Sequence, residues 1–143
     1  MENSMTLHFD ARPVNEGFAR MAVAAFVMKM NPTVECLEDI RTAVSEAVTN
    51  AIVHGYSREQ EQVEIDCRIE GSRVTIDVVD HGIGIEDVSR AMEPFYTSKP
   101  QLDRSGMGFS FMEAFMDELI VDSELGKGTR VRMIKYIDGG DAD

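Results

Sequence analysis

Apolar and polar residues alternate in several short stretches of this chain, and a period of two indicates a strand that buries one face. Residues 5–10 (MTLHFD) show this pattern first. Residues 62–70 and 73–80 show it again on either side of Gly71-Ser72, which supplies a turn. The sequence therefore predicts one early strand and, later, a hairpin of two strands.

Two longer segments repeat their apolar residues three or four positions apart, which is helical spacing. The first, residues 15–30, is stopped by Asn31-Pro32. The second, residues 33–54, is the longest predicted helix and ends at the stop signal Gly55. Its apolar residues share one stripe, namely Leu37, Ile40, Val44, Ala47, Val48 and Ala51.

The second half of the chain begins with a long stretch that has neither period. Residues 80–106 are rich in Gly, Pro and Ser apart from one predicted helical turn, and connections of that length are usually functional. Residues 107–119 are amphipathic at helical spacing, and residues 119–123 and 129–137 alternate as strands on either side of a glycine-containing turn. The predicted order is therefore β-α-α-β-β-loop-α-β-β.

This order favours an α+β fold, a two-layer α/β sandwich in which helices cover one face of a mixed, mainly antiparallel sheet. A length of 143 residues fits one domain, which we expect over residues 1–137. The acidic, glycine-containing end, residues 138–143, is expected to be disordered.

Charge and composition exclude several classes of protein. A formal net charge of −12 opposes direct binding of nucleic acid, whose phosphates would be repelled over most of the surface. No apolar run approaches the roughly 20 residues that cross a bilayer, and the first ten residues do not resemble a secretory signal. Cys36 and Cys67 lack CxxC spacing, which favours reduced, packed thiols. We therefore expect a cytoplasmic protein without membrane or direct nucleic-acid contact.

The long helix carries a line of polar side chains beside its apolar stripe. Glu46, Asn50 and His54 are four residues apart, so they lie one turn above another. Such a line is either a solvated helix face or the border of a ligand cleft. The helix alone does not decide between the two.

A second candidate stretch, DHGIG, follows the third predicted strand. Asp80 ends that strand, and Gly82 and Gly84 allow the backbone to turn sharply and a flat ligand to approach it. A carboxylate there can accept a hydrogen bond from an exocyclic amine. The alternative is a tight turn that needs no ligand.

The third stretch, RSGMGF, opens the last predicted helix. Backbone N–H groups from Ser105 to Gly108 and the positive end of the helix dipole converge there, which suits an anion such as phosphate. The alternative is glycine-assisted helix capping. Lys99 and Arg104, in the preceding loop, are either positive charges over a polyphosphate or exposed loop charges.

The fourth stretch, GKGT, reads first as a hairpin turn. Thr129 has a second use, because its hydroxyl lies at the start of an inner strand, where it can bond to a base or to a bridging water. Four such signals, each at an element boundary, together indicate a nucleotide site. Neither the P-loop motif nor a dinucleotide-binding motif is present in the sequence, so the site is of another type.

These motifs resemble the GHKL ATPase superfamily, which includes gyrase, Hsp90, histidine kinases and MutL. The matching stretches are EAVTN (46–50), DHGIG (80–84), the lid EPFYTSKPQLDRS (93–105), GMG (106–108) and GT (128–129). More narrowly, SEAVTNAIVHGY, PFYTSKP, RSGMGF and FARMAVAAF are similar to the anti-sigma F factors of endospore-forming bacteria, which are serine protein kinases.

The resemblance implies a role for each motif. Asn50 would hold Mg²⁺, Asp80 would read the adenine amino group, and Glu46 would be the catalytic base. The implied ATP contacts are Asn50, His54, Asp80, Gly82, Gly84, Thr97, Lys99, Arg104, Ser105, Gly106, Met107, Gly108 and Thr129. His81 departs from the family pattern, where a small polar or acidic residue is frequent, and this departure leaves the implied nucleotide binding intact.

The resemblance also implies partners. They are a sporulation sigma factor that is bound and inhibited, an anti-anti-sigma protein that is phosphorylated on serine, and a second copy of the chain. The homodimer would use the face containing part of the first helix, where Arg20 is either a partner contact or a solvated arginine. Two alternatives remain: a nucleotide-gated inhibitor of the sigma factor that transfers no phosphate, and a simple ATPase.

Overall fold

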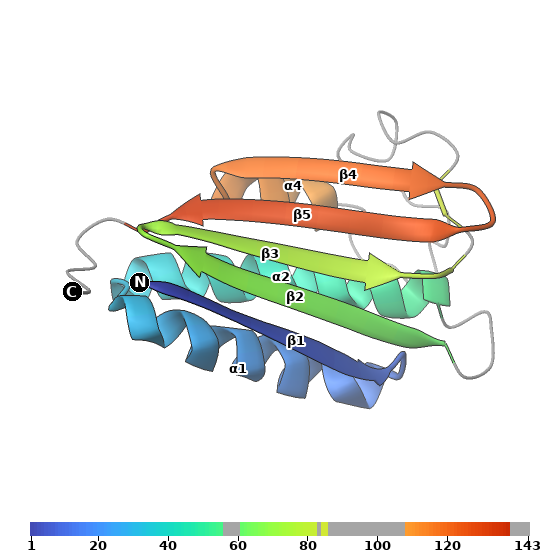
Figure 1. Ribbon diagram of the computed structural model, residues 1–143. Coiled ribbons are helices and arrows are strands. Elements are labelled where there is room, and N and C mark those ends of the chain that lie inside the picture. The colour runs from blue at the N-terminus through green and yellow to red at the C-terminus, as the bar shows by residue number, and fades with distance from the viewer. Residues whose placement is uncertain (56–60, 83, 86–107, 138–143) are drawn as a thin grey trace.

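The strands of this protein form one sheet, and each of its pairings is antiparallel. The computed structural model describes residues 1–55, 61–82, 84–85 and 108–137. Within these residues the sheet has five strands in the order β1-β2-β3-β5-β4 (Figure 1). The strands are β1 (Glu2–Asp10), β2 (Gln62–Glu70), β3 (Arg73–Asp80), β4 (Glu118–Glu124) and β5 (Gly128–Tyr136).

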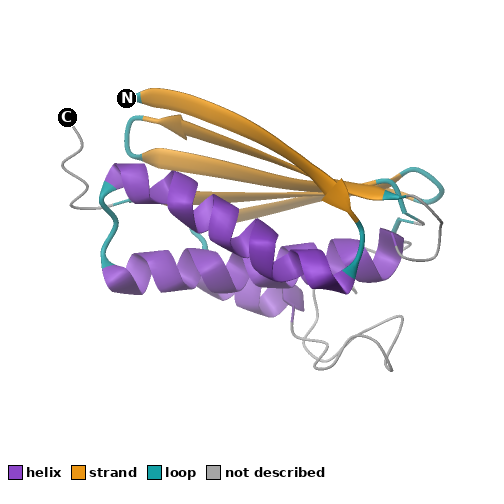
Figure 2. Cartoon of the chain, turned by 90° about the horizontal axis from the view of Figure 1, so that it is seen from below, coloured by secondary structure: helices purple, strands orange, loops and turns teal. Residues whose placement is uncertain are grey.

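The helices of the described residues all cover one face of this sheet (Figure 2). They are α1 (Glu16–Val27), α2 (Val34–Gly55) and α4 (Gly108–Phe115), and short 3-10 turns at Pro13–Asn15 and Met28–Met30 flank α1. The expected two-layer α+β sandwich is therefore confirmed. The sheet is antiparallel rather than mixed because α1 and α2 run in opposite directions, so β2 starts beside the end of β1, where Asp10 pairs with Gln62.

The core lies between the sheet and the helices. Alternation along β2 and β3 buries every second residue, and the expected apolar stripe of α2 faces them. The fully buried side chains include Ile40, Val44, Val48, Ile65, Ile69, Ile76 and Met133. Cys67 belongs to this core, and burial raises the pKa of its thiol to about 12, so the thiol is protonated and inert as expected.

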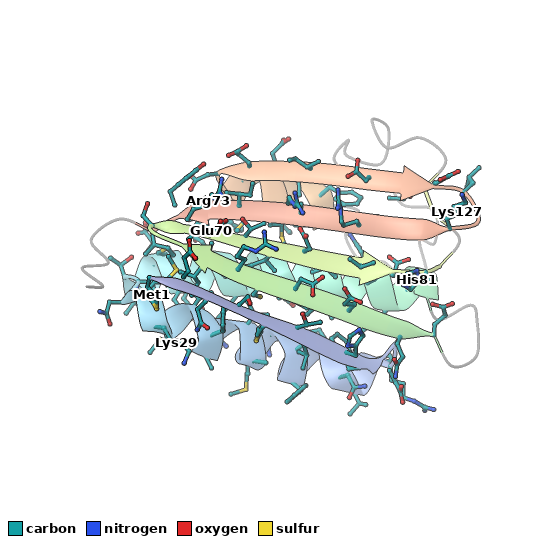
Figure 3. The ribbon with its side chains drawn as sticks, in the orientation of Figure 1. Met1, Lys29, Glu70, Arg73, His81 and Lys127 are labelled. Carbon is teal, nitrogen blue, oxygen red and sulfur yellow. The ribbon has the colours of Figure 1, made fainter. Side chains whose placement is uncertain are left out.

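The opposite face of the sheet carries interlocked charges. Arg132 on β5 makes a two-bond contact with Asp77 on β3, at 2.8 and 2.9 Å, and Arg130 pairs with Asp122 on β4 at 2.6 Å. Glu70 and Arg73 form a further pair across the β2–β3 turn, at the opposite end of the sheet from His81 and Lys127 (Figure 3). This face is polar and bears no helix in the described part of the chain.

The sequence prediction was wrong at one helix boundary. The last helix was expected to run through residue 119, but α4 ends at Phe115 and β4 begins at Glu118. The reason is tertiary: the Asp117 N–H donates to the Ile134 carbonyl at 2.9 Å, and the Asp117 carboxylate accepts the Tyr136 N–H at 2.7 Å. Pairing with β5 therefore outweighs the helical propensity of the segment. The expected tail, residues 138–143, lies outside the described residues.

Candidate functional site

Two side chains of the polar line on α2 meet the start of α4. A Cβ added at Gly108 would lie 3.0 Å from Nδ2 of Asn50 and 3.4 Å from Oε2 of Glu46, so only glycine leaves these side chains their present room. Both side chains are half-buried, which argues against a simple solvated face. The structure thus brings together Glu46, Asn50 and Gly108. The His54 side chain lies outside the description, although its backbone belongs to the last turn of α2.

Asp80 forms a second cluster, at the end of β3. Its side chain is buried, and its carboxylate accepts a hydrogen bond from the backbone N–H of Gly82 at 2.8 Å. Burial raises the pKa of Asp80 to about 6, against the nearby backbone N–H groups of Gly82 and Thr129 and the nearby His81, which lower it. At neutral pH the group is therefore mainly a carboxylate, able to accept a further hydrogen bond from a ligand amine.

Close backbone contacts hold this second cluster. Gly128, with φ of +109°, presses against the backbone of residues 80 and 81, and an added Cβ would lie 2.7 Å from the Cα of His81. Gly84, with φ of +81°, presses in the same way against the β4–β5 turn, where an added Cβ would lie 2.8 Å from the carbonyl carbon of Glu124. Both glycines are therefore required by their conformation and by space.

Thr129 joins the same cluster, where it contacts a residue that the sequence did not single out. Ser123 on β4 contacts Oγ1 of Thr129 at 2.8 Å and accepts the backbone N–H of Ile85 at 2.7 Å. A signal existed in the sequence: the alternation of β4 places Ser123 on the inner side with Leu119 and Val121, where a polar residue needs a partner.

The two clusters lie toward the same end of the molecule. The C-terminal end of α2 and the end of β3 lie together there (Figure 1), and labelled His81 and Lys127 mark that end of the sheet (Figure 3). One cluster offers a carboxylate and an amide beside a helix start, and the other a buried acceptor beside open backbone. A charged group and a base of one ligand suit these two clusters respectively.

Several expected contacts fall outside the described part of the chain. They are the residues of the expected lid and glycine box, namely Thr97, Lys99, Arg104, Ser105, Gly106 and Met107. Their roles stay predictions. Within the described residues, no group of three or more His, Cys, Asp or Glu side chains could hold a metal ion, so any metal there would depend on other ligands.

Arg20 lies on α1, in a position that the sequence left open. Its Nε is 3.8 Å from Oε2 of Glu16, and both atoms are buried without a hydrogen bond to another described residue. The side chain borders a hollow of about 150 Å³ between α1 and α2, which Glu46 also lines. The structure therefore brings Arg20 and Glu46 to one depression, and Arg20 is half-buried rather than fully solvated.

Comparison with known proteins identifies the relatives of this chain. Residues 9–135 match the family described as histidine kinase-like ATPase domain. An anti-sigma F factor of Clostridium botulinum is 55% identical over 135 residues, which cover 94% of each chain. One from Clostridium perfringens is 55% identical over 139 residues, which cover 96% of this chain and 99% of the relative.

A solved structure supports the fold alone. The crystal structure of the RsbU and RsbW domains of a Mycobacterium tuberculosis protein superposes with a TM-score of 0.67 at 18% identity, covering 94% of this chain and 32% of that one. No helix in the described residues is long and apolar enough to span a membrane. On the strength of near-full-length identity above one half, the chain belongs to the anti-sigma F factors, a family built on the histidine kinase-like ATPase domain.

Proposed function

We propose that this chain is an ATP-dependent serine protein kinase that also binds and inhibits a sporulation sigma factor. Its substrate is an anti-anti-sigma partner, phosphorylated on serine. The relatives carry the name anti-sigma F factor over nearly the whole chain, and the ATPase-domain family implies ATP. The kinase activity is supported above all by the position of Glu46 and Asn50, whose side chains lie next to Gly108, the first residue of α4.

Phosphoryl transfer needs few groups, because it is mostly positioning and charge neutralisation. The partner's serine oxygen attacks the γ-phosphorus, the bond from that phosphorus to the ADP oxygen breaks, and the serine proton goes to Glu46. The start of α4 would face the phosphates with backbone N–H groups. Asp80, buried and ionised at neutral pH, would accept from the adenine amino group.

Asn50 is the proposed protein ligand of Mg²⁺. Magnesium keeps several waters and binds substrate phosphates, so one amide oxygen beside a carboxylate fits its preference for few protein ligands. The half-buried Asn50 carboxamide lies next to Glu46 at the start of α4, where phosphates would sit. Bound there, Mg²⁺ would neutralise phosphate charge.

The hollow between α1 and α2 supports the partner half of the proposal. Arg20 and Glu46 both line it, so a partner that contacts Arg20 would lie within reach of the proposed base. Arg20 Nε and Glu16 Oε2 are already desolvated and have no hydrogen-bond partner in the described part of the chain, which favours a partner protein that supplies one. This geometry suits a serine presented from the α1 side.

An apolar stripe along the outer side of α1 and its two flanking 3-10 turns suits the proposed homodimer. Four large side chains recur there at helical spacing and are more than half exposed, namely Val14 (80%), Phe18 (58%), Met21 (65%) and Met28 (54%). Exposed stripes of this kind mark protein interfaces. Met21→Glu is expected to lower the apparent mass in sedimentation from dimer to monomer, whereas Lys29→Glu, just beyond the stripe, leaves it unchanged.

In this proposal residues 1–137 form one catalytic domain. The protein acts in the cytoplasm, where a sigma factor works, and does not contact nucleic acid directly. Its test is incubation with ATP labelled on the γ-phosphate, Mg²⁺ and an anti-anti-sigma protein of the same organism. We expect label on a serine of the partner. Label released only as free phosphate indicates a simple ATPase, and ATP-dependent sigma binding without any transfer indicates the nucleotide-gated inhibitor.

A further inference from the structure

The hydroxyl of Ser123 is the centre of a small hydrogen-bond network. It accepts the Ile85 N–H at 2.7 Å, lies 3.1 Å from the carbonyl oxygen of Gly128 and 2.8 Å from Oγ1 of Thr129. These partners come from the segment after β3 and from the first two residues of β5. One side chain therefore ties the turn that follows Asp80 to the β4–β5 hairpin.

The direction of these bonds follows from counting protons. A serine hydroxyl has one proton and two lone pairs, and a carbonyl can only accept. The Ser123 proton therefore goes to Gly128, and one lone pair takes the Ile85 N–H. The contact with Thr129 is complete only when the threonine donates its own proton to the remaining lone pair. All four groups are then satisfied, as buried polar groups require.

The consequence is that the Thr129 hydroxyl turns lone pairs, and no proton, toward a ligand. Thr129 is buried and pairs with the buried Asp80 across β3 and β5, where paired side chains lie on the same face of the sheet, so this hydroxyl and that carboxylate are neighbours. Both are acceptors. Adenine presents an exocyclic amino group on the edge where guanine presents a carbonyl oxygen, so paired acceptors, acting directly or through a water, favour adenine and oppose guanine.

We propose that Ser123 is a positioning residue that fixes the Thr129 hydroxyl as an acceptor and thereby sets the preference of the site for adenine over guanine nucleotides. This rests on the proposed nucleotide-binding function. Without the Ser123 oxygen, the Thr129 proton has no fixed partner and is free to rotate toward the ligand, where it can donate to a guanine carbonyl. Loss of Ser123 therefore changes selectivity as well as affinity.

The main test compares Mg-ATP and Mg-GTP binding by calorimetry in wild type and Ser123→Ala. One hydrogen bond redirected in a buried site is expected to lower the ratio of ATP to GTP affinity about three- to tenfold. Thr129→Val should lower the ratio too, and the double variant Ser123→Ala/Thr129→Val should match Thr129→Val alone, because Ser123 acts on selectivity only through the hydroxyl that Thr129→Val removes. An unchanged ratio in Ser123→Ala overturns the proposal.

A matched control removes a strand hydroxyl elsewhere. Thr6 on β1 donates to Asp66 at 2.8 Å on the exposed face, so Thr6→Val loses one strand hydrogen bond without touching the site. Its ATP to GTP ratio should equal that of wild type. A purely structural role for Ser123 predicts that both variants shift the melting temperature alone, with no change in the ratio.

A second measurement needs no nucleotide. In the free protein, amide exchange at Ile85 should speed up in Ser123→Ala because its acceptor is gone, and should not change in Thr6→Val. An unchanged Ile85 rate contradicts the network itself. Wild type that binds neither nucleotide ends the proposed function, and the Ile85 result then still decides whether Ser123 holds the turn. Wild type that binds ATP while the variant keeps its selectivity ends only this inference.

Discussion

The two clusters of the site are built in different ways. The cluster at Asp80 is made by backbone pressed on backbone, through Gly84 and Gly128, and its acceptor is buried and already hydrogen-bonded. The cluster at Glu46 is made by half-buried side chains of α2 that reach the first residue of α4. The end that would hold the adenine base (the base end) is therefore fixed by the fold itself. The end that would hold the phosphates (the phosphate end) relies on side chains that can adjust.

Because of this difference, we expect the two ends of the site to respond differently to substitution. A substitution at the base end is expected to disturb folding and binding together, because the same contacts serve both. A substitution at the phosphate end is expected to separate chemistry from stability. Four substitutions test that contrast.

Gly128→Ala should have the largest effect, since the new methyl would press into the Asp80 backbone and the residue holds φ at +109°. We expect a loss of about 3 kcal/mol or more in the free energy of unfolding, with loss of ATP binding. Denaturant titration measures the first and calorimetry the second. Gly126→Ala is the matched control: φ is +82° but nothing lies within 4 Å, so its cost should be only about 1 kcal/mol.

Glu46→Gln should leave the fold intact and remove the proposed catalytic base. Phosphate transfer to the partner is expected to fall about 10²- to 10⁴-fold, the usual range for a general base, while ATP affinity stays within about twofold. Single-turnover transfer of labelled phosphate measures the loss. Glu35→Gln, exposed in the first turn of the same helix, should transfer at the wild-type rate. Undiminished transfer in Glu46→Gln would remove this residue from the mechanism.

Asp80→Asn should lower ATP affinity about tenfold, because the amide offers one acceptor where the carboxylate offered two. For the same reason, wild-type affinity should fall as the pH drops below about 6, the pKa to which burial raises Asp80. Isothermal titration between pH 5 and pH 8 would follow both effects. An affinity that is flat across this range would show that the charge of Asp80 does not contribute.

The same residue couples binding to stability, with a definite sign. Its pKa rises from 3.8 to about 6 on folding, so the stability it contributes is complete below pH 3.8 and is lost as the pH rises through about 6. Asp80→Asn removes this dependence, and we expect the nucleotide-free variant to be up to about 3 kcal/mol more stable than wild type at pH 8. Thermal unfolding at pH 4 and pH 8 checks the difference. Equal free energies of unfolding for Asp80→Asn and wild type at both pH values would contradict it.

Gly108→Ala should have the smallest effect on the fold, because a methyl there meets the ends of two movable side chains rather than backbone. Alanine also favours a helix over glycine, so stability should change by less than about 1 kcal/mol. Phosphate transfer should still fall several-fold as Asn50 and Glu46 shift, which a transfer assay beside a melting curve would reveal. A loss of stability as large as that of Gly128→Ala would erase the contrast between the two ends.

The periods in the sequence were enough for the layers, because burying alternate strand residues against a helical stripe is a local pattern. They were not enough to predict the end of α4. There Asp117 forms hydrogen bonds with Ile134 and Tyr136 of β5, which are 17 and 19 positions away in the sequence. Element boundaries decided by such pairing cannot be predicted from one segment.

The candidate site was predictable to the same extent. Glu46 and Asn50 could be placed on one helix side from their spacing, and their half-burial confirms that this side is not simply solvated. Ser123 was missed because its role depends on Ile85 and Gly128, which reach it only after the sheet is assembled. The roles of Thr97, Lys99 and Arg104 stay predictions.

The turn between β2 and β3 has a practical value for such experiments. Gly71 donates its N–H to the Met1 carbonyl at 3.1 Å, and Ile137 donates its own to the Ser72 carbonyl at 2.8 Å. Both ends of the described chain are thereby hydrogen-bonded to the β2–β3 turn. This turn lies about 25 Å along β3 from Asp80. A fluorophore or affinity handle joined at residue 137 would therefore stand clear of a nucleotide bound at Asp80.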